Sequence, residues 1–211
     1  MHYKDVVNKA KIAPILRIED ICSRRNLLAH ESIQLNRWVK EGKLIRLKRG
    51  LYALPESERK QLLSPLWLAN QLYWPSYISL EYALSSYGII PEAVGAFTSV
   101  TTLKTSHCGN ALGTFGYKNI AMKYFFGFKN IQDGGGAQYW IADPEKAVLD
   151  FIHLSIPRGV RVNADLFIRN YRFQNLEKLQ IKRFREYTAR FSNERVQKAG
   201  RNLIGLIRSG K

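Results

Sequence analysis

Apolar residues recur at helical spacing through the first forty residues of the chain. The pattern predicts a helix over residues 3–12, which ends before Pro14 because the position preceding a proline disfavours helical geometry. A brief second helix is expected over residues 17–22 and a third over residues 30–41, with residues 23–28 as the turn between them.

The third predicted helix has two distinct faces. Leu35, Trp38 and Val39 lie three and four positions apart and should form its buried stripe. The opposite face carries Ile33, Asn36, Arg37 and Lys40, flanked by Ser32 and Gln34. This face is suited to reading DNA, since Arg37 can pair with guanine, Asn36 with adenine, and Ile33 can contact a thymine methyl group. An ordinary solvated helix face is the alternative interpretation.

A basic hairpin follows this helix. Gly42 is expected to end the helix, and residues 44–47 and 51–54 read as two strands joined by a tight turn. The cations on or beside the hairpin are Lys43, Arg46, Lys48 and Arg49, which can contact phosphates. Three helices followed by a hairpin predict a winged helix-turn-helix DNA-binding domain over residues 1–55.

Residues 56–157 read as a larger mixed α/β region after a polar link. Its predicted elements are helices over 63–74 and 80–87, strands over 96–102, 116–122, 123–128 and 138–142, and loops over 104–112 and 130–137. The aromatic run at 123–128 is interpreted as strand core, with stacking on nucleic-acid bases as the alternative.

The segment DPEKAVLDFI, residues 143–152, is predicted to open a helix. Asp143 is expected to cap it, Pro144 to occupy its first position, and Lys146 to pair with Asp150 on its surface. A catalytic role for Asp143, Glu145 and Asp150 would need a metal or a base partner, and the sequence offers none. We therefore assign no catalytic residue.

The last part of the chain, residues 158–211, reads as a basic helical tail with helices over 164–171, 175–187 and 194–208. Its cations predict a second surface for nucleic acid, at Arg169, Arg172, Lys182, Arg183, Arg185 and Arg190. The fold class is accordingly α+β, and residues 56–211 are expected to form one C-terminal domain.

Charge is segregated along the chain, whose formal net charge is +16. Residues 1–54 carry 12 basic and 5 acidic residues, residues 55–150 carry 7 and 8, and residues 151–211 carry 14 and 4. Two basic ends around a neutral middle indicate a polyanionic partner, and nucleic acid is favoured over a membrane. A solubilising excess of charge is the plainer alternative.

Other classes of protein find little support in the sequence. No apolar run approaches the roughly 18–20 residues that span a bilayer, and the N-terminus does not resemble a signal peptide. The four histidines and two cysteines lack metal-ligand spacing, and no glycine loop for phosphate precedes a Lys-Ser/Thr pair. We expect a soluble, cytoplasmic protein with no metal or cofactor and no membrane partner.

Four stretches together resemble the AbiEi-type antitoxin family, the transcriptional regulators of type IV toxin–antitoxin systems. They are LKRGLYAL at Leu47–Leu54, YISLEYALSSYGIIPE at Tyr77–Glu92, FTSVTT at Phe97–Thr102 and DPEKAVLDFI at Asp143–Ile152. They occur in the family's order and span most of residues 15–155, whereas the tail after about Arg158 matches least clearly.

The resemblance implies an N-terminal domain that binds operator DNA and represses its own operon. It also implies a C-terminal domain that neutralises a nucleotidyltransferase toxin without forming a stable complex with it. A stand-alone regulator with the same fold is one alternative. Another is an RNA-binding protein whose basic tail makes the main contact, while an enzyme has no support in the sequence.

Overall fold

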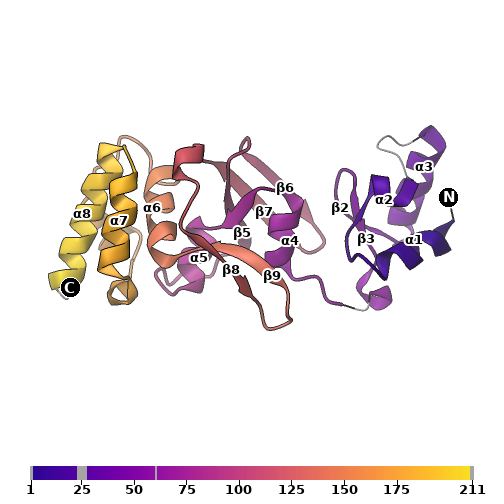
Figure 1. The fold of residues 1–211 in the computed structure, drawn as a ribbon, viewed down its shortest axis with the longest axis horizontal. Coiled ribbons are helices and arrows are strands. Elements are labelled where there is room, and N and C mark those ends of the chain that lie inside the picture. Colours follow the sequence, from indigo (N-terminus) through magenta and orange to yellow (C-terminus); the bar gives the residue numbers. More distant parts are fainter. Residues whose placement is uncertain (1, 23–27, 60, 210–211) are drawn as a thin grey trace.

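The protein is an elongated, mixed α+β molecule, as the computed structural model shows for residues 2–22, 28–59 and 61–209. Three parts follow one another along the long axis: an N-terminal unit, a central sheet, and C-terminal helices (Figure 1). The two ends of the chain lie at opposite ends of the molecule. The α+β class expected from the sequence is confirmed.

The N-terminal unit contains three helices and a small antiparallel sheet. Its elements are α1 (Tyr3–Ala10), β1 (Leu16–Arg17), α2 (Ile18–Cys22), α3 (Ala29–Lys40), β2 (Ile45–Lys48) and β3 (Leu51–Ala53), with strand order β1-β3-β2. The three predicted helices and the hairpin are confirmed, with boundaries shifted by one or two residues. Of the predicted turn at 23–28, only residue 28 lies within the described residues.

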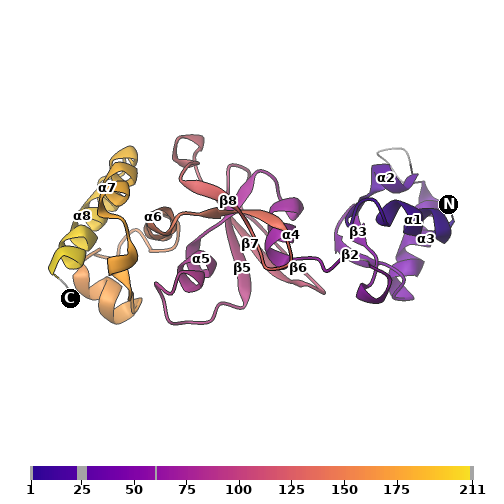
Figure 2. The ribbon, with the colours of Figure 1, turned by 60° about the horizontal axis from the view of Figure 1, so that its bottom comes forward.

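Strand β3 is buried on both faces. Tyr52 and Leu54 pack into the core of the N-terminal unit, while Leu51 and Ala53 belong to the core of the central part. Successive side chains of a strand point to opposite faces, so one short strand serves both cores. The hairpin β2–β3 therefore faces the central sheet, and α3 lies on the far side of the unit, as both views show (Figures 1 and 2).

The central part is built on a six-stranded sheet of order β6-β7-β5-β4-β9-β8. After the 3-10 turn η1 (Glu56–Glu58), its elements are α4 (Pro65–Leu72), β4 (Ser76–Ile78), α5 (Leu80–Ser86), β5 (Ala96–Thr101), β6 (Ser106–Asn110), β7 (Gly113–Asn119), η2 (Met122–Tyr124), β8 (Phe128–Gln132) and β9 (Gln138–Ala142). Pairs β5–β7 and β4–β9 are parallel, and the other pairs are antiparallel. Helix α4 lies toward the N-terminal unit, whereas α5 lies toward the C-terminal helices (Figure 1).

Three predictions for the central part are wrong. The predicted loop over 104–112 contains β6, an edge strand of small and polar residues that gives no alternating apolar signal. The predicted strand over 123–128 is instead a 3-10 turn that leads into β8, and β8 extends into the predicted loop over 130–137. Gly127, at φ +71°, bends the chain here where a Cβ would approach Tyr187 to 2.9 Å and Lys146 to 3.2 Å.

The C-terminal part is helical, as predicted, but its second predicted helix is interrupted. Its elements are α6 (Pro144–Leu154), the π-helical η3 (Leu166–Asn170), η4 (Leu176–Lys178), α7 (Ile181–Arg190) and α8 (Glu194–Ser209). Helices α7 and α8 pack so closely that a Cβ on Gly200 would lie 2.6 Å from a methyl carbon of Thr188. Phe184, Phe191 and Val196 are fully buried, so this part completes the core and is not an independent tail.

Candidate nucleic-acid interface

Helix α3 positions the predicted reading face. The Glu31 carboxylate accepts a hydrogen bond of 2.9 Å from the backbone N–H of Leu28, which satisfies a donor at the start of the helix. Leu35 and Trp38 are buried, and the Trp38 ring meets Tyr3 edge-on with 5.4 Å between centroids. The helix is thus anchored along one stripe, which leaves its opposite side free.

That opposite side is exposed as predicted. Ile33, Asn36, Arg37 and Lys40 are all exposed, and they line one surface hollow together with Glu41. The flanking Ser32 and Gln34 are partly exposed. Ile33 leaves 68% of its surface in solvent, which is a large exposure for an apolar side chain and is compatible with contact to a base.

Glu41 is a charged neighbour that the sequence reasoning missed. Its carboxylate accepts from the Arg37 guanidinium at 2.7 Å and from the Lys43 ammonium at 2.9 Å. Arg37 lowers the pKa of Glu41, and Glu41 raises the pKa of Arg37, by hydrogen bonding. The i, i+4 spacing of Arg37 and Glu41 was the available signal. DNA binding would have to draw Arg37 away from this carboxylate.

The hairpin cations occupy different environments. Arg46 and Arg49 are exposed, and the Arg46 guanidinium lies 6.0 Å from the centroid of the Tyr52 ring. Lys48 instead donates a hydrogen bond to the backbone carbonyl of Leu72 in the central part, with its ammonium 5.7 Å from the Tyr73 ring. Burial lowers the pKa of Lys48. Lys48 therefore belongs to the contact between the hairpin and the central part.

Most cations of the predicted second surface have partners within the protein. Arg172 forms an ion pair with Glu92 at 2.6 Å, and Arg169 forms one with Asp165 at 3.4 Å. Arg183 lies 3.7 Å from the Glu145 carboxylate and 3.8 Å from that of Asp143. The Arg190 guanidinium lies 3.5 Å from the centroid of the Phe126 ring. Lys182 and Arg185 on α7 are exposed and have no such partner in the described part of the chain.

Helix α8 adds three exposed cations that the predicted surface did not include. Lys198, Arg201 and Arg208 lie along one side of the helix, and their spacing of three and seven residues was a readable signal. Arg195 on the same helix is different, because its guanidinium donates to the carbonyls of Ile156 at 3.1 Å and Pro157 at 2.7 Å. It thereby holds the chain just beyond the end of α6.

The predicted pair of Lys146 and Asp150 forms, but its predicted place on the surface is wrong, since both side chains are completely buried. The Lys146 ammonium donates to Asp150 and to the Tyr77 hydroxyl at 2.9 Å, and the Asp150 carboxylate also accepts from Tyr77 and Ser79, each at 2.9 Å. Burial, the largest cause, and the Asp150 charge raise the pKa of Tyr77. This network joins α6 to β4 and to the loop that follows β4.

Asp143 and Pro144 occupy the predicted N-cap and first positions of α6, but the Asp143 carboxylate makes no capping hydrogen bond to the helix. It accepts a hydrogen bond of 2.9 Å from the Tyr187 hydroxyl of α7 instead. Glu145 likewise accepts from the backbone N–H of Gln180 at 2.7 Å. Asp143 and Glu145 therefore join the start of α6 to α7 and to the residue that precedes α7.

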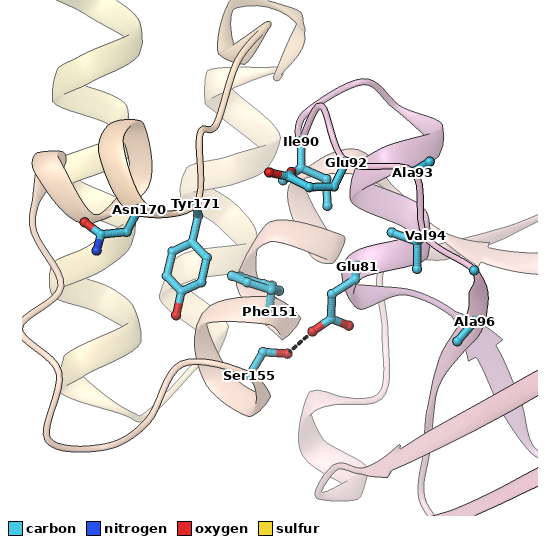
Figure 3. Close-up of a pocket in the computed structure, with 11 residues that line it drawn as sticks. Glu81, Ile90, Glu92, Ala93, Val94, Ala96, Phe151, Ser155, Asn170 and Tyr171 are labelled. Atoms are coloured by element: carbon cyan, nitrogen blue, oxygen red, sulfur yellow. Dashed lines mark hydrogen bonds between the residues drawn. The ribbon is translucent and has the colours of Figure 1, made fainter.

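A hollow of about 530 Å³ lies between α5, the loop after it, α6 and the end of η3 (Figure 3). The Ser155 hydroxyl donates to the Glu81 carboxylate at 2.9 Å, and Arg172 pairs with the Glu92 carboxylate. The rest of the lining is mainly apolar, including Phe151 and Ile90. Both carboxylates thus already have partners among the described residues.

Within the described residues, no three histidine, cysteine or acidic side chains come close enough to hold a metal ion. Over the same residues, none of the helices is long and apolar enough to cross a membrane.

Comparison with known families supports the N-terminal assignment. Residues 8–55 match the model of a family described as "Transcriptional regulator, AbiEi antitoxin". No curated protein matches the chain. The resemblance to the AbiEi antitoxin family is thus confirmed over the segment that contains α3 and the hairpin.

Proposed function

We propose that this chain is a DNA-binding transcriptional repressor and the antitoxin of a type IV toxin–antitoxin system. Residues 1–55 act as a winged helix-turn-helix that binds operator DNA, with α3 in the major groove. The observation that carries the proposal is the exposed side of α3, where Ile33, Asn36, Arg37 and Lys40 share one surface. The order of helices and strands, α1-β1-α2-α3-β2-β3, is that of a winged helix.

In this proposal, different side chains contact the bases and the phosphates of the operator. Arg37, Asn36 and Ile33 read base edges, while Ser32, Gln34 and Lys40 flank them on the same helix. The phosphates are contacted by Lys43, Arg46 and Arg49. Lys48 contributes by holding the hairpin against the central part through the Leu72 carbonyl.

Residues 56–211 form the antitoxin domain in this proposal. They neutralise a nucleotidyltransferase toxin in the cytoplasm without binding it stably, and the winged helix represses the shared operon. The match over residues 8–55 supports the regulatory half, and the motifs at Tyr77–Glu92 and Asp143–Ile152 support the antitoxin half.

The test is binding of the whole protein to a duplex from its own promoter, measured by fluorescence anisotropy. Arg37→Ala should weaken binding to this duplex about 5- to 160-fold and reduce discrimination against mutated operators, because a bidentate arginine–guanine contact is worth about 1–3 kcal/mol. The logarithm of the association constant should also fall with the logarithm of salt concentration by about 0.9 per phosphate contact.

Lys4→Ala on α1 is the matched control, since Lys4 is an exposed cation outside the proposed interface. The two proteins should melt at the same temperature. If Arg37→Ala binds the promoter as tightly as the control and discriminates operators as well, α3 is not the reading helix.

The exposed cations of the C-terminal helices favour a second candidate, RNA binding. Lys182, Arg185, Lys198 and Arg201 have no partner within the described residues. Truncating the chain near residue 157 would expose core residues, so charge reversal is the sounder test. If Lys198→Glu combined with Arg201→Glu keeps full protection against the toxin in cells, this surface is not needed for antitoxin action.

A further inference from the structure

A cleft of about 850 Å³ lies between the hairpin and the central part, away from the proposed reading face of α3. Its volume falls in the range of roughly 300–1,000 Å³ found for ligand sites. One wall includes Arg17, Lys48 and Arg49, and the other includes Tyr73, Trp74 and Trp140. Cations face aromatic rings across this cleft, and the operator-binding proposal uses neither the aromatic wall nor Arg17.

The aromatic wall is firmly held but leaves one large ring in solvent. The Tyr73 hydroxyl donates to the carbonyl of Lys104 at 3.0 Å, and its ring packs against Tyr117 with centroids 5.0 Å apart. The backbone N–H of Trp140 donates to Asn70 at 2.7 Å. Trp74, next to Tyr73, keeps 62% of its surface exposed. A planar apolar surface of this kind is suited to stacking on a base.

The opposite wall carries available positive charge. Arg17 and Arg49 are exposed, and neither guanidinium has an ion-pair partner among the described residues. Lys48 is committed to the Leu72 carbonyl, and Glu19 is the carboxylate in the lining. Three cations and one carboxylate give the cleft a formal charge of +2. Guanidinium groups form paired hydrogen bonds with phosphate oxygens.

We infer that this cleft binds a nucleotide unit, with its base stacked on Trp74 and its phosphate held by Arg17. The chemistry suits a free nucleotide and an unpaired nucleotide of a single strand equally well. The inference goes beyond operator recognition, because a base inside a duplex is already stacked and cannot lie on Trp74.

The probe is an octamer of thymidine labelled with fluorescein, titrated with the full-length protein in an anisotropy assay. Adenosine monophosphate and ribose 5-phosphate serve as unlabelled competitors. The protein should bind the octamer, and ribose 5-phosphate should compete much less well than adenosine monophosphate because it has no base. If adenosine monophosphate displaces the octamer, a free nucleotide is a sufficient ligand. If adenosine monophosphate does not displace the octamer, the site is specific for single strands.

Trp74→Ala should weaken binding of the octamer at least about fivefold, which is the lower end of the effect of removing a stacking ring. Trp74→Phe should stay within about twofold of the natural protein, because it keeps a ring. Arg17→Ala should weaken binding and reduce the salt dependence by about 0.7, the value for one phosphate of a single strand. Met122→Ala and Lys4→Ala, two exposed positions elsewhere, should bind the octamer normally.

The inference would be overturned by no binding of the octamer at about 0.1 mM protein, or by Trp74→Ala binding the octamer as tightly as the natural protein. It would also be overturned if ribose 5-phosphate displaced the octamer as well as a competing adenosine monophosphate does, or if an octaglutamate peptide displaced it as well as unlabelled octamer does. Equal competition by the peptide would mean that the cleft selects negative charge alone. Promoter duplex binding separates this inference from the proposed function. Trp74→Ala should leave binding to the promoter duplex unchanged. Arg37→Ala should weaken binding to the promoter duplex and leave binding to the octamer unchanged.

Discussion

The two basic ends of this molecule use their charges differently. On α3 and the hairpin, Lys40 and Arg49 extend into solvent with no ion-pair or ring partner among the described residues. Arg46 lies over the Tyr52 ring, and Arg37 and Lys43 share the Glu41 carboxylate. In the C-terminal part, Arg169, Arg172, Arg183, Arg190 and Arg195 are held by carboxylates, a ring or backbone carbonyls. The C-terminal part has the larger net charge, yet these five cations contact groups of the protein itself.

This difference shows that net charge is a poor measure of the charge available to a ligand. The Arg195 guanidinium, for example, donates to backbone carbonyls and so has fewer donors left for a phosphate. Substitution of a cation should therefore reduce either the stability of the protein or its affinity for nucleic acid, according to what the side chain contacts.

The largest effect is expected for Lys146, the completely buried cation. Lys146→Met should lower the free energy of unfolding by about 3–5 kcal/mol, because Asp150 is left buried without its partner. The double variant Lys146→Met with Asp150→Leu should recover much of this loss. Urea denaturation measures both. Equal stability of the single variant and the natural protein would contradict the buried pair.

A smaller loss of stability is expected for Arg195. Arg195→Ala should lower the free energy of unfolding by about 1–2 kcal/mol, because carbonyls beyond the end of α6 lose charged donors. Lys198→Ala on the same helix should leave thermal unfolding unchanged, as Lys198 is exposed and without a partner in the described chain. If both variants melt alike, Arg195 does not stabilise this junction.

Adjacent residues of the hairpin provide the sharpest test. Lys48→Ala should lower stability by about 1 kcal/mol, because the hairpin loses its bond to the Leu72 carbonyl. Arg49→Ala should leave stability unchanged and reduce the salt slope of operator binding by about 0.9, the value for one phosphate contact. Calorimetry measures the change in stability, and anisotropy measures the salt slope. The prediction would be contradicted if Arg49→Ala lowered stability and Lys48→Ala reduced the salt slope.

The smallest effect concerns His153, whose ring packs edge-on against Tyr124 and Phe191. Burial is the largest cause that lowers the pKa of His153 below its ordinary value of 6.5. The charge of Asp150 raises this pKa, while the charges of Lys146, Arg158 and Arg195 lower it. Below about pH 6.5 the unfolded chain therefore takes up a proton more readily than the folded chain.

Stability supplied by neutral His153 should thus be present above pH 6.5 and decline as the pH falls. Thermal unfolding of His153→Gln, followed from pH 7.5 to 5.5, should decline less steeply than that of the natural protein. Identical pH profiles would show that this histidine does not contribute.

Local patterns were sufficient to predict α3 and the orientation of its faces. A 3.6-residue period is visible within the helix itself, and Leu35, Trp38 and Arg37 lie where that period places them. The burial of Lys146 and Asp150 could not be predicted in this way. Their partners Tyr77 and Ser79 are about 70 residues away in sequence, and only the folded sheet brings them together.

The same limit applies to the basic residues. Whether Arg172 or Arg185 is available to a ligand depends on whether a distant carboxylate such as Glu92 lies beside it. Strand β6 was missed for another reason: residues Ser106–Asn110 are small or polar because they form a sheet edge, so they lack an apolar alternation.

Strand β3 contributes buried side chains to two hydrophobic cores. If the N-terminal unit unfolded alone, Leu51 and Ala53 would leave the central core, and Leu47 on the neighbouring strand would leave with them. Neither core can thus lose its structure without exposing apolar surface in the other. We expect heating to produce one cooperative calorimetric transition, although the N-terminal unit is joined to the central part by a single passage of the chain.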